Sequence, residues 1–321
     1  MRSERRLRWN ASSSASTDRI RADRSPGAPC DARVPSRLRH RGGMLDPLLD
    51  RLGVLSAAQL DAMGVTRRSR DEAVARGRLV RVRRGWFARP DADRTVVDAV
   101  RAEGCVSCAS ALRLRGAWVP EGLAGRHVRH ADHRREQGRR GCLPHGGNPP
   151  VRAALDDLET AFRCVLRCGS AEDVVVIADS LLHLRLVTLE DLAASARSAP
   201  RWVTGLLATT DRAESGLESI VRVRLRSCRL RVRAQVWIGA RRVDLVVGDR
   251  LVIECDGAEH HGGWAAQSAD RARDRALVAS GYLVMRVTYR QVLDDWPAIE
   301  QEILAVVRRR EHRWPRRRDA V

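Results

Sequence analysis

The chain of 321 residues is predicted to be an α/β protein with several domains. Three observations predict this. A hydrophobic content of 44% is enough for more than one core. Apolar residues recur at helical spacing through most of residues 45–205. From residue 209 onward, helical and alternating patterns follow one another in the order α-β-β-β-α-β-α.

Arginine dominates the charge of the chain. All 59 basic residues are arginine, and against 40 acidic residues they give a net charge of +19. Such an excess favours a polyanionic partner, and DNA is the main candidate. A membrane surface is the weaker alternative, because no stretch approaches the roughly 18 apolar residues of a membrane span. No apolar signal region follows the basic start, so we expect a cytoplasmic location.

Composition divides the chain into five segments. Residues 1–43 are rich in Arg, Ser, Ala and Pro and are expected to form a disordered basic leader, with Met44 as an alternative start. The other segments are an N-terminal domain (44–92), a helical middle region (93–208), a C-terminal domain (209–312) and a basic tail (313–321).

Residues 44–92 have the pattern of a winged helix. We expect helices over 45–52, from Ser56 to Ala62 and from Thr66 to Arg76, followed by a hairpin over 79–87. This arrangement can place the third helix in a major groove of DNA. A solvated charged face or a protein-docking module is the alternative. The candidate DNA-contacting residues are Arg67, Arg68 and Arg70 on the helix and Arg81, Arg83 and Arg84 on the hairpin.

The same segment resembles the N-terminal domain of the AbiEi family of type IV antitoxins. The motifs that carry the resemblance are Ser56-Ala-Ala-Gln-Leu, Gly64-Val-Thr and Gly77-Arg-Leu-Val-Arg-Val-Arg-Arg-Gly-Trp-Phe. The resemblance covers about fifty residues and implies a winged helix associated with transcriptional autoregulation.

The middle region is predicted to be mainly helical, over residues 96–102, 107–115, 151–166, 171–183 and 189–196. Residues 120–150 between these helices are rich in Arg, His and Gly. Their histidines suggest a metal site but lack the i,i+4 spacing of helical ligands, so we favour a solvated basic loop. These histidines are His127, His130, His133 and His145.

The eight cysteines give a similar choice. Cys105 and Cys108 have CxxC spacing, but no second such pair follows at the distance of a zinc ribbon. Cys164 and Cys168 lie one turn apart in an apolar helix. We therefore favour small buried hydrophobes with reduced thiols over a zinc site.

The C-terminal domain is predicted to begin with a helix capped by Asp211, in which Glu214 has only a capping role and Glu218 lies one turn further on. A strand over 232–238 and a hairpin over 242–256 follow, the hairpin turning at Gly248-Asp249. The remaining elements are a helix over 268–279, a strand over 282–287 and a helix over 291–309.

The hairpin carries acids inside its apolar strands, with Asp244 in the first strand and Glu254 and Asp256 in the second. Side chains alternate along a strand, so Glu254 and Asp256 share a face. If the register places Asp244 opposite, three carboxylates converge. Such a cluster needs a shared proton or a cation, and a hard divalent ion fits oxygen ligands. Each acid taken alone could instead lie on a solvated face.

The element order and the acids together resemble the PD-(D/E)XK nuclease fold, and within it the uncharacterised Vsr-like branch related to very-short-patch-repair endonucleases. The motifs that carry this resemblance are Ser215-Gly-Leu-Glu218, Gln235, Val243-Asp244-Leu245, Ile253-Glu-Cys-Asp-Gly257, His260-His261, Asp270-Arg-Ala-Arg-Asp274 with Leu277, and Gly281-Tyr-Leu-Val-Met-Arg286.

The resemblance implies that Glu218, Asp244 and Glu254 bind Mg²⁺ (or Mn²⁺) and activate water for phosphodiester hydrolysis. The lysine of the wider fold is replaced here by Asp256, which removes the usual cationic helper. We expect Asp244, Glu254 and Asp256 to be metal ligands and Glu218 to orient the attacking water.

Residues that follow the hairpin are candidates for proton transfer and phosphate binding. His260 is the preferred proton-transfer group, with His261 in reserve and a hydrogen-bonded turn histidine as the alternative. Arg271 and Arg273 would bind phosphates, or would pair with acids at i,i+3 spacing on their own helix.

The predicted function is therefore a metal-dependent DNA endonuclease with a DNA-binding winged helix. The alternative is a non-catalytic transcriptional regulator or type IV antitoxin-like protein, which would have a cognate toxin as partner. A homodimer is the other partner state that we consider.

Overall fold

The computed structural model describes residues 51–211, 213, 215–257 and 274–315. Several predictions fall outside these residues: the leader, the alternative start at Met44, most of the helix over 45–52 and the end of the basic tail. The same holds for Glu214, His260, His261, Arg271 and Arg273. No helix among the described residues is long and apolar enough to cross a membrane.

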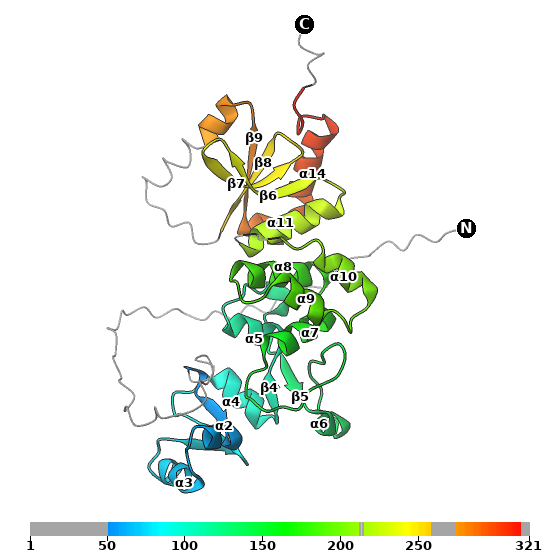
Figure 1. The fold of residues 1–321 in the computed structure, drawn as a ribbon. Coiled ribbons are helices and arrows are strands. Elements are labelled where there is room, and N and C mark those ends of the chain that lie inside the picture. Colours follow the sequence, from blue (N-terminus) through cyan, green and yellow to red (C-terminus); the bar gives the residue numbers. More distant parts are fainter. Residues whose placement is uncertain (1–50, 212, 214, 258–273, 316–321) are drawn as a thin grey trace, which may run out of the picture. The chain divides into compact units, whose positions relative to one another are not determined.

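The first described segment contains two helices and a small sheet (Figure 1). Its elements are β1 (Val54–Ser56), α2 (Ala57–Ala62), α3 (Arg67–Ala75), β2 (Val80–Arg83) and β3 (Trp86–Ala88). Ser56 caps α2 in a capping box with Gln59, and Thr66 caps α3, so both predicted helices begin at the predicted caps. The predicted hairpin is β2–β3, and the unpredicted strand β1 pairs with β3.

The middle region is mainly helical, as predicted, but it also contains two short strands. Its elements are α4 (Arg94–Arg101), β4 (Gly104–Val106), α5 (Cys108–Leu114), η2 (Glu121–Leu123), β5 (Val128–His130), α6 (Asp132–Glu136), α7 (Leu158–Cys168), α8 (Ala171–His183), α9 (Leu189–Ser195) and α10 (Arg201–Leu207). Strands β4 and β5 pair antiparallel. The prediction of a simple loop over 120–150 is therefore wrong.

The helix predicted over 151–166 begins later, at Leu158. The segment before it pairs with β4 instead: Val106 donates its backbone N–H to Ala154, and Asp156 donates to Val106, both at 2.9 Å. These bonds commit the backbone to an extended path. Asp157 then starts the helix by accepting from the Thr160 N–H at 2.7 Å.

The C-terminal domain follows the predicted order α-β-β-β-α-β-α, except that two helices take the place of the last one. It consists of α11 (Gly216–Ser227), β6 (Val232–Ile238), β7 (Arg241–Val247), β8 (Leu251–Asp256), a helical stretch at 274–279, β9 (Leu283–Thr288), α13 (Tyr289–Asp294) and α14 (Trp296–Arg308). The strands form one sheet in the order β6-β7-β8-β9, with the last pair parallel and the others antiparallel.

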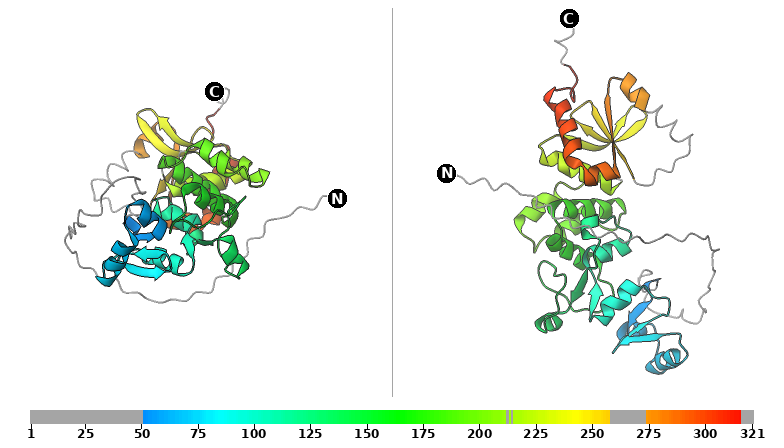
Figure 2. Two further views of the ribbon diagram at one scale, coloured as in Figure 1. Left: turned by 60° about the horizontal axis from the view of Figure 1, so that its bottom comes forward. Right: turned by 180° about the vertical axis from the view of Figure 1, so that it is seen from behind.

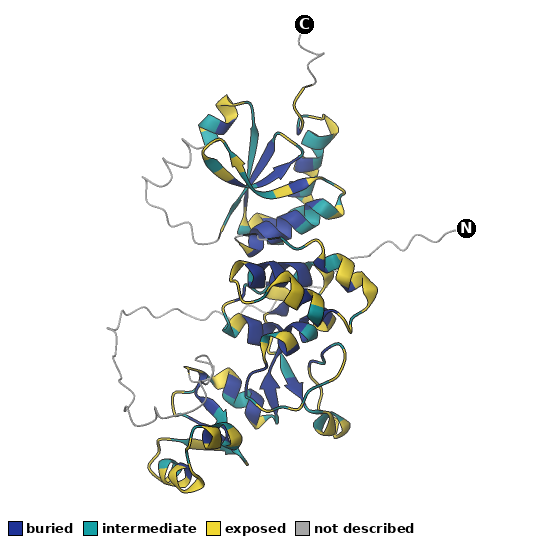
Figure 3. Ribbon diagram, viewed as in Figure 1, coloured by how far each residue is buried: buried dark blue, intermediate teal, exposed yellow. Residues whose placement is uncertain are grey.

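Helices cover both faces of this sheet (Figures 1 and 2). On one face, apolar residues of α11 and α14 pack with Leu245, Leu251 and Ile253. On the other face, Leu277 packs with Val246 and Val252. In Figure 3, most of α11 is in the buried colour, and the strands are buried over the second half of β7 and the first half of β8. Strand β8 is therefore central, and polar side chains at its carboxyl end are held in a fixed frame.

Two helix boundaries of this domain differ from the prediction. Helix α11 is capped by Ser215, whose Oγ accepts from the Glu218 N–H at 3.2 Å, and not by Asp211. The predicted last helix is two helices separated at Asp295, whose backbone is not helical (φ −138°, ψ 37°). Pro297 in the first turn of α14 lacks an N–H, which favours a new helix start.

Candidate active site

Two of the predicted acids meet at the β7–β8 pair. The register places Leu245 opposite Ile253, so Asp244 and Glu254 occupy the next opposing positions. Side chains at opposing positions of an antiparallel pair lie on the same face. Asp244 Oδ2 also accepts from the backbone N–H of Cys255 at 2.9 Å, which fixes its carboxyl group beside β8. The predicted contact between these two acids is thus present.

The pair has a marked effect on the acidity of Glu254. Burial, the charge of Asp244 and a hydrogen bond with Asp244 together raise the pKa of Glu254 to about 7, while Arg286 acts in the opposite direction. An ordinary surface glutamate would be ionised well below this pH. The two carboxyl groups therefore share a proton near neutral pH unless a cation takes its place.

Glu218 reaches the same region from helix α11. Its side chain is buried, 4% exposed, and Gln235 Nε2 donates to its Oε2 at 2.5 Å. Gln235 has a positive φ of 54° inside β6, where the ladder skips the position opposite Asp244. A non-glycine residue in that conformation is strained and persists only where its surroundings fix it. The irregularity holds the Gln235 amide on the carboxyl group of Glu218.

The pKa of the Cys255 thiol responds to all four predicted acids. Burial raises its pKa well above the ordinary value, and the carboxylates of Asp244, Glu218, Glu254 and Asp256 raise it further, in that order. All the predicted acids thus act electrostatically on one side chain of β8.

The prediction that Asp256 joins Asp244 and Glu254 in one cluster needs correction. Arg286 Nη1 donates to Asp256 Oδ1 at 2.9 Å, and the same guanidinium binds both oxygens of Asp274 at 2.9 Å. Among the described residues, no three carboxylates come close enough to hold one ion. Asp256 is therefore an ion-pair partner of Arg286 in this structure.

Arg286 is a site residue that the sequence reasoning missed. It is the parallel register partner of Glu254, on β9, and so lies on the same face of the sheet. It supplies a fixed positive charge where the lysine of the wider fold is lacking. A signal was present in the sequence, because an arginine inside an apolar strand next to an acid-bearing strand needs a partner.

The N-terminal arginines divide into two groups. The side chains of Arg67 and Arg68 are 90% and 91% exposed on α3. Arg70 is buried: its Nη1 binds Asp61 and donates to the Val65 carbonyl at 2.9 Å. The expectation that Arg70 contacts DNA is corrected on this ground, since a buried, paired guanidinium serves the fold.

The hairpin arginines of the same segment differ in exposure. Arg81 lies on the Phe87 ring and pairs with Asp71 at 3.0 Å, and Arg83 lies on the Trp86 ring. Arg84 is exposed at the hairpin turn. Stacking of this kind orders the hairpin while leaving Arg81 and Arg84 at the surface.

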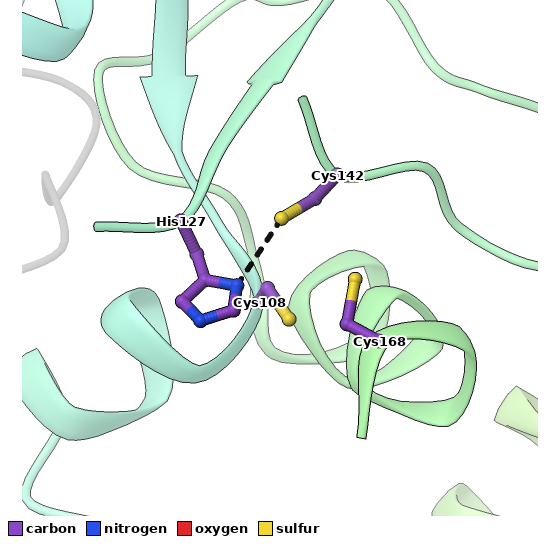
Figure 4. Close-up of side chains that lie close together, drawn as sticks. All are labelled: Cys108, His127, Cys142 and Cys168. Carbon is purple, nitrogen blue, oxygen red and sulfur yellow. Dashed lines mark hydrogen bonds between the residues drawn. The ribbon is translucent and has the colours of Figure 1, made fainter. Parts of the chain in front are cut away.

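A second cluster of ligating side chains lies outside the acidic site. Cys108, His127, Cys142 and Cys168 bring their ligand atoms within 4.8 Å of one another (Figure 4). The expectation of small buried thiols and of a solvated basic loop around His127 did not include this meeting of four side chains. Cys105 and Cys164 do fit the expectation, since both are fully buried in the core; His130 is buried too, with its carbonyl bound by Asn148.

A comparison with protein families supports a restriction-endonuclease-like, PD-(D/E)XK-like class for the C-terminal domain. The model of the restriction-endonuclease-like family REase_MTES_1575 matches residues 217–307, less than half of the chain. No curated protein shows a significant match to this chain.

Proposed function

We propose that the chain is a metal-dependent DNA endonuclease whose active site is centred on Asp244 and Glu254. The observation that carries the proposal is the contact of these two acids on a restriction-endonuclease-like sheet, with the pKa of Glu254 raised to about 7. Two carboxyl groups held against each other in a half-buried site are costly unless a positive charge joins them.

The residues at this site fit a divalent ion. Asp244 and Glu254 offer carboxylate oxygens, which are the ligands that Mg²⁺ and Mn²⁺ prefer. Their mutual repulsion in the absence of an ion is the driving force for binding one. When bound, the ion would polarise the scissile phosphate and stabilise charge on the leaving oxygen.

The neighbouring side chains would provide the rest of the chemistry. Glu218, fixed by Gln235, would orient the attacking water at the edge of the pair. Arg286 neutralises Asp256 and Asp274 and would present positive charge to the phosphate. His260 remains our candidate for proton transfer, and Arg271 and Arg273 remain candidates for phosphate binding; all three lie outside the described residues.

Plasmid cleavage tests the proposal. Supercoiled plasmid incubated with the purified chain and Mg²⁺ or Mn²⁺ should be nicked or linearised, and EDTA should stop the reaction. Intact plasmid across a range of divalent ions, salt concentrations and DNA structures would contradict the proposal.

The raised pKa of Glu254 predicts how stability depends on pH. The folded-state pKa of about 7 exceeds the ordinary 4.5. The contribution of Glu254 to the free energy of unfolding is therefore fully present below pH 4.5 and is lost as the pH rises through 7. Glu254→Gln keeps the neutral form, so we expect this variant to gain stability relative to the natural chain between pH 5 and 8. Denaturant unfolding without added Mg²⁺ measures this.

The control for this prediction is Glu302→Gln, an exposed change on α14, which should show no such pH trend. Added Mn²⁺ should reduce the gain of Glu254→Gln, because an ion compensates the same charge. A pH-independent difference in stability between the variant and the natural chain would be inconsistent with a half-buried carboxyl pair that shares a proton.

We further propose that residues 51–92 form a winged helix that binds duplex DNA through α3. This proposal rests on the exposed side chains of Arg67 and Arg68 on α3. Arg81 and Arg84 on the adjoining hairpin are exposed as well, whereas Arg83 is half-buried on the Trp86 ring. Arginines on such a surface bind phosphates and release counterions.

A paired substitution tests the DNA surface. Arg67→Ala with Arg68→Ala should weaken duplex binding and lower the salt dependence of affinity by about one unit of slope per lost phosphate contact. The measurement is fluorescence anisotropy over a salt series. Arg101→Ala, an exposed arginine on α4, is the matched control. Unchanged affinity and slope would exclude α3 as the binding surface.

A non-catalytic regulator is the second candidate function. It is favoured by the helix–helix–hairpin order of the first segment and by Asp256 at the usual lysine position. Sequence-specific binding to its own promoter that survives Asp244→Asn, combined with no cleavage, would support it. A cognate toxin encoded next to the gene would support the antitoxin-like form of this alternative.

A further inference from the structure

We propose that Cys108, His127, Cys142 and Cys168 form a structural zinc site in the middle region. The four side chains come from separate elements: Cys108 begins α5, His127 precedes β5, Cys142 follows α6, and Cys168 ends α7. Their ligand atoms all lie within 4.8 Å of one another, and Figure 4 shows the side chains pointing toward a common point.

The distances suit a single tetrahedral ion. With Zn–S bonds of about 2.3 Å and a Zn–N bond of about 2.0 Å, tetrahedral ligand atoms stand roughly 3.5–3.8 Å apart. His127 Nδ1 already lies 3.3 Å from Cys142 Sγ. A small contraction of the other ligands would complete the geometry. An iron–sulfur cluster is a poorer fit, because bridging sulfides and several irons hold the thiolates farther apart.

The donor set also selects the metal. Three thiolates and one imidazole are soft or borderline ligands, which favour zinc over the magnesium proposed for the carboxylate site. Four protein ligands leave no open position, so the site is structural. Cys108 is fully buried and Cys142 is 8% exposed, whereas Cys168 is exposed and gives the ion a path of entry.

The backbone around the ligands is built to hold them. Ser107 donates its N–H to the His127 carbonyl, and the His127 N–H donates to Ser110 Oγ, both at 3.0 Å. The Cys142 N–H donates to the Val128 carbonyl at 2.8 Å. These bonds fix both His127 and Cys142 beside the start of β5.

The backbone at Gly141 and at Cys108 also brings the ligands close together. A Cβ on Gly141 would lie 2.3 Å from the Val128 carbonyl oxygen, so only glycine allows Cys142 to approach β5. Cys108 has a φ of 52°, a left-handed conformation that a non-glycine residue keeps only when its surroundings fix it. An ion bound by Cys108 would supply such a constraint.

Elemental analysis of the full chain tests the site first. The chain, purified without chelator and dialysed against metal-free buffer, should retain about one zinc per molecule. Cys142→Ser should lose the zinc, while Cys228→Ser and His133→Ala, which change a thiol and an imidazole outside the cluster, should retain it. Absence of zinc from the natural chain, or zinc retained fully in Cys142→Ser, would overturn the proposal.

Alkylation of Cys168 provides a test that needs no variant. Cys168 is exposed and should react rapidly with iodoacetamide unless an ion holds its thiolate. We expect slow reaction in the natural chain, fast reaction after a zinc chelator is added, and slow reaction again after zinc is restored. The alkylation rate of the partly exposed Cys228 should be the same in all three conditions. Rapid alkylation of Cys168 before chelation, or a disulfide among the three cysteines, would overturn the proposal.

Discussion

Asp244→Asn and Glu254→Gln are each expected to lower the rate of plasmid cleavage by roughly 10²–10³-fold, the scale on which removal of one preorganised electrostatic group acts. Each change keeps the shape of the side chain but removes a carboxylate from the pair at the β7–β8 register. The remaining acid alone would hold a divalent ion weakly. Single-turnover cleavage at saturating enzyme measures the effect.

The matched control for this pair is Asp249→Asn. Asp249 is an exposed acid at the turn that joins the same two strands, so it changes charge by the same amount without touching the site. The Asp249→Asn variant should cleave plasmid at the same rate as the natural chain. Equal losses in Asp249→Asn and Asp244→Asn would point to a general effect of charge, and full activity in Asp244→Asn would remove the pair from the mechanism.

Asp156→Ala is expected to destabilise the middle region by about 3–5 kcal/mol, because it leaves a buried arginine without its charged partner. Arg129 Nε donates to Asp156 Oδ2 at 2.7 Å and Nη2 donates to Oδ1 at 2.6 Å. Arg129 is 1% exposed and Asp156 7%. Denaturant unfolding followed by circular dichroism measures the loss.

Asp98→Ala is the control for the buried pair. Asp98 pairs with Arg101 at 3.1 Å, with both side chains largely exposed, and such pairs contribute about 0–1 kcal/mol. A loss of stability in Asp156→Ala no larger than that in Asp98→Ala would show that the bidentate pair is not buried in solution.

The C-terminal fold could be predicted because its signals are local. Apolar alternation in β6, β7 and β8, the Gly248-Asp249 turn and the helical period of α11 each act within a few residues. The sequence leaves the position of Asp244 opposite Glu254 conditional, because a two-residue turn at Gly248-Asp249 would pair Val247 with Arg250. The observed turn has one more residue and pairs Val247 with Leu251. The split of the last helix at Asp295 needed Pro297 to be read as a helix start.

Partners distant in sequence account for what the sequence reasoning missed. Asp256 was assigned to the acid cluster because its strand face was known, but the ion pair with Arg286 depends on the parallel β8–β9 register. The place of Arg70 at the start of the predicted third helix favours DNA contact, but its partner Asp61 lies on the preceding helix and draws it into the fold. In both cases a tertiary contact, and not the local sequence pattern, determines the role of the side chain.

The Cys/His cluster shows the same limit more strongly. Its ligands lie on α5 and α7 and in the segments before β5 and after α6, and they follow none of the short ligand spacings typical of zinc ribbons. The meeting of Cys108 with Cys168 depends on the packing of α5 against α7 within one core. A further clue in the sequence is Gly141 directly before Cys142, since a glycine there permits close backbone approach.

Crystals of the chain grown with Mn²⁺ test the central claim, that Asp244 and Glu254 together hold a divalent ion. Anomalous scattering should reveal manganese in contact with a carboxylate oxygen of each residue, on the face of the sheet that Arg286 shares. Manganese bound elsewhere, with the two carboxyl groups still joined by a proton at pH 8, would contradict the claim.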